Sequence, residues 1–471
     1  MGQLHIVLFP AMAYGHIIPT LDLAKLFTSR DLRATIITTP PFAPTVERAH
    51  SSGHEIGLET LDFPPENSLL PKNIVSLDQV PSPELLAKFF EATALLRDPL
   101  ERLLRHLDAS CLVSDMLHPW TVGPAKALGI PRLVFHCMSY FALCASEHMY
   151  AHKPFFESLS SDSDAFALPG LPHEVTFVRS QIPGYYLGRD DAFLSHRKKM
   201  RETDRESFGV VVNSFYELEP DYADHYKNVL GLKAWHVGPL LLLCNNNDES
   251  RRGKESDIDE RDCLAWLDSK KSNSVVYLCF GSMVTFARGQ LREIAAGLES
   301  SGHGFVWAVR HEGNDDPLPE GFEERTRGRG LVIRGWAPQM AILGHEAVVG
   351  FVTHCGWNSI LEGVCTGVPM VTWPAFAEQF YNEKLVSEVL RVGVPVGSKK
   401  WERVGIEGVG REAVRAAVQK VMVDDEMRQR AEGLREMAKR AIGEGGSSYE
   451  GLNELIDELR VYGPPKKQDM N

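Results

Sequence analysis

Short runs of β-branched and apolar residues alternate with helical segments along most of this chain. Residues 4–9 form one such run, residues 20–30 carry leucine and phenylalanine at helical spacing, and residues 33–39 (RATIITT) are again short and β-branched. A strand, a helix and a second strand in this order are typical of a βαβ unit, the building block of a parallel sheet. The alternation therefore predicts an α/β protein.

The alternation recurs on both sides of a polar break at residues 243–258. That stretch combines three asparagines with mixed charges and serine, which is typical of a linker. Because 471 residues are too many for one core, we expect two doubly wound domains, 1–242 and 259–450, that face each other across a cleft. The further predicted strands are 111–114, 131–135, 208–213, 275–280, 305–310, 331–334, 348–353 and 368–373. Further helical stretches are predicted after the strand 111–114 as far as residue 126, over 289–301 and over 410–459.

Composition and charge narrow the class of function. The net charge is −13 with histidine neutral, so the chain is not expected to bind nucleic acid through a broad basic surface. None of the eight cysteines forms a CxxC pair, so we expect buried free thiols in a reducing compartment and no zinc site. No apolar run is long enough to span a membrane, and His5, Pro10 and His16 interrupt the N-terminal apolar run, so no signal peptide is expected. These features predict a cytoplasmic protein.

Residues 336–379 read WAPQMAILGHEAVVGFVTHCGWNSILEGVCTGVPMVTWPAFAEQ. A predicted strand ends just before His354, Gly356 permits a sharp turn, and Asn358 or Ser359 begins a helix that Gly367 ends. A helix N-terminus at the carboxyl end of a parallel strand offers free N–H groups and the positive end of the helix dipole. The segment therefore predicts an anion site, most naturally for phosphate.

Other side chains of the same segment suit the rest of a nucleotide sugar. The indole of Trp336 offers a flat face to a base, and the amide of Gln339 can bond sugar hydroxyls. Glu362, on the predicted helix, suits two vicinal ribose hydroxyls, and Glu378 and Gln379 suit a hydroxylated ligand. Each residue alone has an ordinary structural explanation, as a core aromatic, a buried histidine or a surface pair. Their arrangement together favours a nucleotide, a diphosphate and a sugar.

Two polar residues in the first half follow predicted strands. His16 lies after the first strand, at the start of a helix, where the helix dipole disfavours the imidazolium form. Asp115 follows the strand 111–114. Taken singly, His16 can be a loop histidine and Asp115 a helix N-cap. Because both lie at the carboxyl ends of strands in one sheet, a His–Asp pair is favoured, in which the carboxylate orients the ring.

The span from Trp336 to Gln379 resembles the signature box of the plant secondary-product UDP-glycosyltransferases, a family of inverting transferases that use nucleotide sugars. WAPQ, HCGWNS, GVPM, WP and EQ all stand in register, and HIVLFPAMAYGHIIP, SDMLHPW, VVNSFYELE, HVGP and FGS are also typical of the family. The likeness is greatest to a branch that includes abscisate, scopoletin and flavonoid glucosyltransferases. The resemblance implies the GT-B fold, two facing Rossmann-like domains, with residues 451–471 as a helix and tail that pack back on the first domain.

The resemblance also implies a reaction and its residues. His16 takes the proton from an acceptor hydroxyl, Asp115 orients and stabilises its ring, and the product is a β-glucoside of inverted configuration. Gln379, as the final glutamine of the box, favours UDP-glucose. Trp336 would stack on uracil, Gln339 and Glu362 would hold ribose, His354, Asn358, Ser359 and Ser282 would bind the diphosphate, Trp357, Glu378 and Gln379 would face the sugar, and Ala337 and Gly356 complete the UDP-sugar-binding set.

No cofactor and no metal are expected, because helix dipole and neutral donors stabilise the diphosphate and UDP-glucose is a co-substrate. No DxD-type acidic pair stands in a suitable place, since Asp315-Asp316 and Asp424-Asp425 lie in loop-like or helix-end contexts.

The acceptor is expected to be a hydrophobic, hydroxylated plant metabolite, either a flavonoid or other phenolic or a steroid or terpenoid, and the enzyme a monomer. HCMSYF stands where HGTSFF is common in the family, so Cys137 and Met138 replace smaller or hydroxylated residues. The open alternatives are another UDP-sugar (galactose, xylose or rhamnose), extension of an existing glycoside, and a catalytically silent nucleotide-sugar-binding protein. The candidate acceptor-pocket residues are Met12, Tyr14, Phe89, Met138, Tyr140 and Tyr186.

Overall fold

The computed structural model describes residues 3–51, 53–188, 191–243, 258–310, 316 and 318–462. The chain forms two compact units, each built around its own parallel sheet. Unit 1 consists of Met1–Tyr140, Gly188–Asp248 and Arg440–Asn471, and unit 2 of Phe141–Leu187 and Glu249–Lys439.

These units differ in composition from the predicted domains 1–242 and 259–450. Residues 141–187 group with unit 2, although the sequence places them in the first domain. Unit 1 takes up the chain again at Arg440, eleven residues before the predicted position 451. The predicted linker 243–258 falls outside the described residues except for its two end positions.

The sheet of unit 1 has seven strands, all parallel, in the order β3-β2-β1-β4-β5-β8-β9. Its two central pairs bring β1 beside β4, with Phe9 opposite Ser114, and β4 beside β5, with Asp115 opposite Phe135. Every residue of these three strands is buried, as expected for a parallel sheet covered on both faces. The strands are β1 (His5–Phe9), β2 (Arg33–Thr38), β3 (Ile56–Thr60), β4 (Cys111–Asp115), β5 (Arg132–His136), β8 (Gly209–Val212) and β9 (Ala234–His236).

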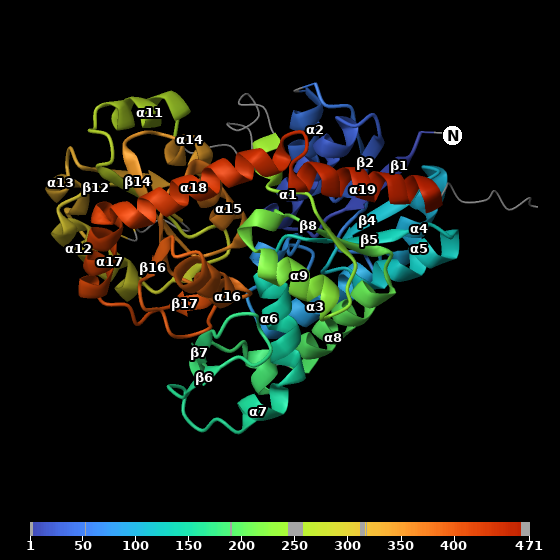
Figure 1. Ribbon diagram of the computed structural model, residues 1–471, viewed down its shortest axis with the longest axis horizontal. Helices are drawn as coiled ribbons and strands as arrows, with labels where there is room; N and C mark the ends of the chain where they lie inside the picture. Colours follow the sequence, from blue (N-terminus) through green and yellow to red (C-terminus); the bar gives the residue numbers. More distant parts are fainter. Residues whose placement is uncertain are drawn as a thin grey trace, which may run out of the picture. The chain divides into compact units, whose positions relative to one another are not determined.

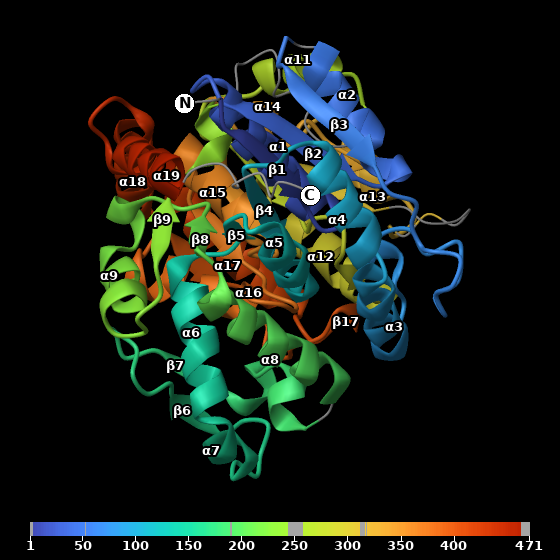
Figure 2. The ribbon, with the colours of Figure 1, turned by 90° about the vertical axis from the view of Figure 1, so that its right-hand side faces the viewer.

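Helices cover the sheet of unit 1, and the last one comes from the end of the chain (Figures 1 and 2). α19 packs on β9, and a Cβ on its Gly451 would lie 2.6 Å from the carbonyl oxygen of His236. Only glycine permits so close an approach of helix and strand. The helices are α1 (Tyr14–Thr28), α2 (Ala43–Ser51), α3 (Pro83–Ala94), α4 (Arg97–His106), α5 (Val122–Leu128), α8 (Asp191–Glu206), α9 (Pro220–Asn228) and α19 (Ser447–Tyr462).

The sheet of unit 2 has six parallel strands in the order β13-β12-β10-β14-β15-β16. β10 and β14 are central, and Cys279 pairs with Thr353 at their carboxyl ends. The strands are β10 (Val275–Cys279), β12 (Gly304–Val309), β13 (Gly330–Arg334), β14 (Val348–Thr353), β15 (Met370–Thr372) and β16 (Gly393–Pro395), with two small pairs, β11 (Thr285–Phe286) with β17 (Val404–Ile406) and β6 (Ala165–Ala167) with β7 (Thr176–Val178).

The helices of unit 2 enclose a core that includes Trp307, Trp373 and Phe280. α12 packs against α17 on this core, where Gly297 of α12 lies so close to Val414 that a Cβ would be 2.7 Å from its side chain. The helices are α6 (Tyr140–Ala151), which begins at the boundary between the units, α7 (Lys153–Glu157), α11 (Glu260–Asp268), α12 (Arg288–Ser301), α13 (Phe322–Arg325), α14 (Gln339–Leu343), α15 (Trp357–Thr366), α16 (Gln379–Lys384), α17 (Arg411–Val423) and α18 (Asp425–Ile442).

The expectation of two doubly wound α/β domains is confirmed, and several local boundaries differ from it. The helix predicted at 20–30 begins earlier, at Tyr14, because Pro19 falls in its second turn without ending it. The helical stretch predicted over 410–459 is three helices, α17, α18 and α19. The strand β3 was not predicted, since its sequence, IGLET, carries a glycine and two polar residues.

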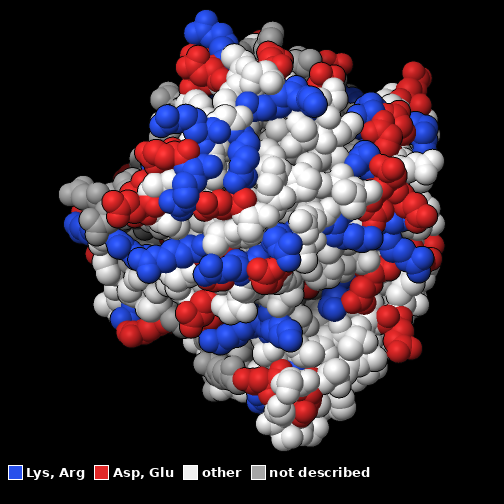
Figure 3. All heavy atoms as spheres, turned by 90° about the vertical axis from the view of Figure 1, so that its left-hand side faces the viewer, with Lys and Arg blue, Asp and Glu red and all other residues white. Residues whose placement is uncertain are grey.

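Acidic and basic side chains are interspersed over the face of the molecule drawn in Figure 3. Many form exposed pairs within or between helices, such as Arg411 with Glu293 and Lys439 with Glu436. Such exposed pairs contribute little stability each. Within the described residues, no helix combines the length and the apolar character needed to cross a membrane. The seven described cysteines are free thiols, and six of them are buried.

Candidate active site

The structure brings His16 and Asp115 together at the carboxyl edge of the unit 1 sheet. His16 lies in the first turn of α1, and Asp115 is the last residue of β4. Because β1 and β4 are parallel neighbours, the segments that follow them leave the sheet side by side. His16 Nδ1 lies 2.7 Å from Asp115 Oδ2. The pair predicted from two strand ends is therefore a hydrogen-bonded pair.

The environment of the pair sets its protonation. Burial opposes ionisation of Asp115, but the charge and hydrogen bond of His16, the nearby His118 and the N–H of Leu117 together hold the pKa of that carboxyl below its ordinary value. An ionised Asp115 accepts the Nδ1 proton of His16, which leaves Nε2 as the basic nitrogen. The His16 side chain is 19% exposed and that of Asp115 is 0% exposed. A solvent-accessible base is thus oriented by a sheltered carboxylate.

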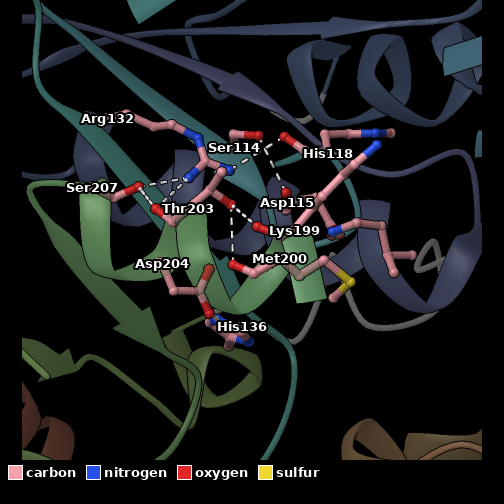
Figure 4. Close-up of polar contacts among 11 residues, drawn as sticks. Ser114, Asp115, His118, Arg132, His136, Lys199, Met200, Thr203, Asp204 and Ser207 are labelled. Atoms are coloured by element: carbon pink, nitrogen blue, oxygen red, sulfur yellow. Dashed lines mark hydrogen bonds and ion pairs between the residues drawn. The ribbon is translucent and has the colours of Figure 1, made fainter. Parts of the chain in front are cut away.

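A buried guanidinium supports the loop that follows Asp115 (Figure 4). Arg132, at the start of β5, donates from Nε to Thr121 Oγ1 at 2.8 Å and from Nη2 to the carbonyl oxygen of His118 at 3.3 Å. The N–H of His118 in turn donates to the carbonyl oxygen of Asp115 at 3.1 Å. Burial lowers the pKa of Arg132 to about 10, so the group stays charged at neutral pH. Its bonds fix the backbone from which Asp115 projects.

Strand β5 also forms hydrogen bonds to the end of α8, as Figure 4 shows. Arg132 Nη1 donates to Ser207 Oγ at 2.6 Å, just past the last turn of α8. At the other end of β5, His136 Nε2 lies 3.0 Å from Asp204 Oδ2. Strand β5 therefore holds α8 at two points, one of them shared with the Asp115 loop.

The candidate acceptor-pocket residues have different neighbours. Tyr14 is partly exposed and its ring lies 5.1 Å from that of Phe42, while Phe89 packs edge-on against Phe63 at 5.1 Å. Met12 and Met138 are buried, with 2% and 4% of their surface exposed.

The two remaining pocket candidates, Tyr140 and Tyr186, belong to different units. Tyr140 packs against Tyr226 and His236 and lines a cavity of about 520 Å³ beside α19. Tyr186 belongs to unit 2, where its hydroxyl donates to the carbonyl oxygen of Ser146 at 3.1 Å. The predicted domain 1–242 includes this residue, whereas residues 141–187 group with unit 2.

In unit 2, the chain turns sharply between β14 and α15. Cys355 adopts a left-handed backbone with φ of +65°, which is costly for a residue with a side chain. Gly356 is the N-cap of α15 in an extended conformation, and no side chain caps the helix there. The helix begins at Trp357, one residue before the predicted Asn358. The first N–H groups of a helix have no intrahelical acceptor and lie at the positive end of its dipole, an environment that suits an anion.

His354 sits between two glycines that leave room for its ring. A Cβ on Gly281 would lie 2.7 Å from His354 Cε1, and one on Gly356 would lie 2.5 Å from Nε2. Burial lowers the pKa of His354 to about 4, so the ring is neutral. Its buried Nδ1 has no hydrogen-bond partner within the described part of the chain. A buried polar atom of this kind needs a partner, and a ligand oxygen at the start of α15 would supply one.

Two residues assigned to ribose contact each other. Gln339 begins α14, and its Nε2 donates to Glu362 Oε2 on α15. The hydroxyl of Tyr277, buried on β10, donates to Gln339 Oε1 at 3.1 Å. The amide is thereby held in one orientation beside the carboxylate. Trp336 lies just before α14 and is partly exposed, as a base-stacking residue must be, and Ala337 after it is buried.

The side chain of Gln379, at the end of the span 336–379, bonds to the backbone just before it. Gln379 Oε1 accepts the N–H groups of Ala375 at 3.0 Å and Phe376 at 3.1 Å. Because Oε1 already accepts these two bonds, the group that Gln379 can offer to a ligand is its Nε2 amide, as a donor. Glu378, beside it, is partly exposed.

The other predicted residues of the box differ in their exposure. Trp357 is buried, with 2% of its surface exposed. Ser359 is buried with 8% exposed, while Asn358, like Ser282 in the turn after β10, is partly exposed. The carbonyl oxygen of Ser282 accepts a hydrogen bond from Arg310.

Two residues near these sites, Asn382 and Trp401, escaped the sequence reasoning, and a third, Cys137, was noted only as a departure from the family's pattern. Asn382 Nδ2 donates to the carbonyl oxygen of Cys355 at 2.9 Å, and Trp401 Nε1 donates to the carbonyl oxygen of Ala377 at 3.1 Å. Cys137 lies beside His16 and Asp115. The one local signal was the spacing of Asn382, four residues after Glu378 on one helix face.

Comparison with known proteins now bears on these sites. Residues 196–431 match the family of UDP-glucoronosyl and UDP-glucosyl transferases. A scopoletin glucosyltransferase of Nicotiana tabacum is 53% identical over 98% of this chain and 99% of its own length. The chain belongs to the UDP-glycosyltransferase family. This glycosyltransferase is thus an enzyme that transfers a sugar from a UDP-sugar.

Solved structures of plant members of the family share its fold. A Glycyrrhiza uralensis UGT complexed with glycyrrhetinic acid 3-O-monoglucuronide superposes with a TM-score of 0.90 at 39% identity, covering 98% of this chain and 96% of that one. A Medicago truncatula UGT complexed with UDP-glucose superposes with a TM-score of 0.82 at 29% identity, covering 97% and 98%. The glycosyltransferase therefore has the GT-B fold that its sequence resemblance implies.

Proposed function

We propose that this glycosyltransferase transfers glucose from UDP-glucose to a hydroxyl of a hydrophobic plant metabolite, a flavonoid or other phenolic or a steroid or terpenoid, and gives a β-O-glucoside with inversion. The observation that carries the proposal is the 2.7 Å contact between His16 Nδ1 and Asp115 Oδ2. Further support comes from the similarity to a scopoletin glucosyltransferase and to a UGT complexed with UDP-glucose.

In the proposed reaction, His16 Nε2 takes the proton of the acceptor hydroxyl. The acceptor oxygen forms a bond to the anomeric carbon from the face opposite UDP, and the bond from that carbon to the diphosphate oxygen breaks. Asp115 keeps the proton of Nδ1 in place and stabilises the imidazolium as it forms. Inversion follows from a single attack on the face opposite the leaving group.

The departing diphosphate is assigned to the start of α15. The N–H groups of the first turn and the helix dipole favour negative charge there, with His354, Asn358 and Ser359 as neutral donors. These groups supply the charge stabilisation that a metal ion provides in other transferases, so catalysis is proposed to need no metal and no cofactor. Trp336 is assigned to uracil, Gln339 and Glu362 to ribose, and Gln379 to the sugar.

A second candidate is the extension of an existing glycoside. It is favoured by the Glycyrrhiza uralensis UGT, whose bound ligand already carries a glucuronide. Another donor sugar is a third candidate within the same reaction. A catalytically silent nucleotide-sugar-binding protein is disfavoured, because such a protein has no use for an oriented histidine base.

The test is a UDP-release assay with purified enzyme, followed by mass spectrometry of the products. UDP-glucose, UDP-galactose, UDP-xylose and UDP-rhamnose are each offered with flavonols, coumarins, abscisate, steroidal aglycones and their monoglycosides. We expect a gain of one hexose from UDP-glucose on an aglycone, with a β-linkage by proton NMR. Products from monoglycosides alone would support the second candidate. UDP binding without release from any donor would overturn the proposal of catalysis.

A further inference from the structure

A thiol completes a cluster with the proposed catalytic pair. His16, Asp115 and Cys137 each offer one ligand atom, and the three atoms lie within 4.8 Å of one another. The residues come from α1, the end of β4 and the position just after β5, three elements that meet at one edge of the unit 1 sheet. Among the described residues, no other group of three such side chains is placed to hold an ion.

The expectation of no zinc site rested on the absence of local cysteine pairs. Local spacing cannot detect this cluster, because its members are 99 residues apart for His16 and Asp115 and join only through the order of strands in the sheet. A metal site at this position is therefore compatible with the absence of cysteine pairs in the sequence.

The donor set fits a borderline divalent cation. A thiolate, an imidazole and a carboxylate are the three side-chain ligands of Zn²⁺, whereas Mg²⁺ and Ca²⁺ need a shell of oxygen atoms. One thiolate and one carboxylate also balance the two positive charges of the ion. A neutral assembly of this kind reduces the cost of placing a cation beside Asp115, whose side chain is 0% exposed.

The geometry needs only a small adjustment. Ligand atoms around a tetrahedral Zn²⁺ lie roughly 3.3–3.6 Å apart, given bonds of about 2.0–2.3 Å. The three atoms already lie within 4.8 Å, and His16 Nδ1 and Asp115 Oδ2, at 2.7 Å, must separate by less than about 1 Å. His16 is the member that can move, because its side chain is 19% exposed. Its exposure also leaves a path for the ion and for a water molecule in the fourth position.

We propose that His16, Asp115 and Cys137 together bind one Zn²⁺ or similar borderline divalent cation, and that the bound ion inhibits glycosyl transfer. Binding releases the Cys137 thiol proton to solvent and moves the one ring proton of His16 from Nδ1 to Nε2. The imidazole, held by the ion, is then no longer free to take a proton from an acceptor hydroxyl. The inhibition rests on the role proposed for His16, whereas the binding rests on the cluster alone.

Binding is tested first with Co²⁺ as a spectroscopic probe of the full-length enzyme. We expect one equivalent of Co²⁺ to produce a thiolate-to-cobalt charge-transfer band and the intense visible bands of tetrahedral coordination, and Zn²⁺ to abolish both. Absence of the charge-transfer band in the wild-type enzyme would overturn the inference. It would leave the proposed reaction untouched, since that reaction needs no metal.

Inhibition is tested with variants, each compared with its own rate in the presence of a chelator. Cys137→Ala and Cys137→Ser should both lose the charge-transfer band and raise the Zn²⁺ concentration for half-inhibition by about tenfold or more. Cys111→Ala is the matched control, because it removes a buried thiol from β4, at the opposite end of that strand from Asp115. It should keep both the band and the wild-type inhibition.

The remaining outcomes separate the two proposals. Equal Zn²⁺ sensitivity in wild type and in both Cys137 variants would overturn the site, and so would an equal loss of sensitivity in Cys111→Ala. A full charge-transfer band with unaltered transfer would overturn the inhibitory half of the inference. An enzyme that is inactive with every donor even in chelator would overturn the proposed function, while the Co²⁺ titration would still decide the metal site.

Discussion

Asn382 Nδ2 donates a hydrogen bond to the carbonyl oxygen of Cys355, at 2.9 Å, and so holds the one left-handed residue in the turn before α15. Both residues are buried. The bond joins α16 to the turn that presents the N–H groups of α15. An unsatisfied buried carbonyl costs about 1–3 kcal/mol, so this contact determines whether the turn keeps its shape.

Replacement of Asn382 by alanine should therefore weaken UDP binding by about tenfold, a change of about 1.4 kcal/mol. The reason is that the turn relaxes and the first N–H groups of α15 no longer point toward the same ligand. Calorimetric titration with UDP measures the effect. Asn228→Ala removes an exposed asparagine from α9 and should change nothing. Wild-type UDP affinity in the Asn382 variant would show that the turn keeps its conformation unaided.

His16→Ala should abolish transfer while UDP binding persists, because the base belongs to unit 1 and the α15 turn to unit 2. Asp115→Asn should lower kcat by roughly 10³–10⁴-fold, since an amide in place of the carboxylate stabilises the wrong tautomer of the ring and no longer stabilises the imidazolium. Steady-state kinetics and UDP titration are measured side by side. Wild-type turnover in the His16 variant would remove that residue from the mechanism.

Gly356→Ala should displace the ring of His354, because the new Cβ would lie 2.5 Å from Nε2 although φ at this position, −61°, suits alanine. UDP affinity should fall about tenfold or more, and His354→Ala should cost little further in the Gly356→Ala background. Gly289→Ala is the control, since nothing lies within 4 Å of its Cβ position in α12. Additive losses in the double variant would mean that Gly356 acts without His354.

Gln379→Glu should separate support of the loop from recognition of the sugar. A carboxylate still accepts the N–H groups of Ala375 and Phe376 but has no amide to donate. We expect kcat/KM for UDP-glucose to fall by about two orders of magnitude while competitive inhibition by UDP stays at its wild-type level. A parallel loss of UDP inhibition would indicate that the substitution disturbs the loop rather than the sugar contact.

The buried carboxyl of Glu383 should make the stability of the enzyme depend on pH. Burial raises its pKa from 4.5 to about 7, although Thr372 donates to it at 2.8 Å. The folded protein therefore binds an extra proton between about pH 4.5 and 7, and the free energy of unfolding falls as pH rises through this window. Urea unfolding at several pH values should show that ionisation of Glu383 lowers the free energy of unfolding by up to about 3 kcal/mol across this window.

Glu383→Gln should remove that decline, because the amide keeps an acceptor for Thr372 and cannot ionise. Glu346→Gln, an exposed carboxylate of the same unit, should leave the pH profile unchanged. Profiles of the same slope in wild type and Glu383→Gln would show that Glu383 remains ionised, or uncoupled from folding, throughout the range.

The sequence predicts most of both sheets and much of the site because the relevant signals are local. A buried apolar run that ends in a polar residue places that residue at a sheet edge, which is how His16 and Asp115 could be paired. The β14–α15 turn could likewise be read from Gly356, although Asn358 and Ser359, the residues expected to begin the helix, lie inside it. Such patterns do not depend on which strand lies beside which.

What the sequence could not predict depends on contacts between distant segments. Residues 141–187 join unit 2 through contacts such as the ring pair Phe177–Tyr381, which has no local signature. Cys137 joins His16 only because β5 lies beside β4. The oxygen of Gln379 bonds to its own loop, so the half of the amide left for a ligand emerges only from the folded backbone.

The return of α19 to β9 has a consequence for synthesis. Unit 1 draws on three separate stretches of the chain, and the last of them, Arg440–Asn471, is translated only after Glu249–Lys439 of unit 2. Because a ribosome releases the chain from its N-terminus onward, β9 remains without its covering helix while the second stretch of unit 2, Glu249–Lys439, is made. The first unit to begin folding is therefore the last to be finished, and a nascent chain stopped anywhere before α19 carries an exposed sheet edge.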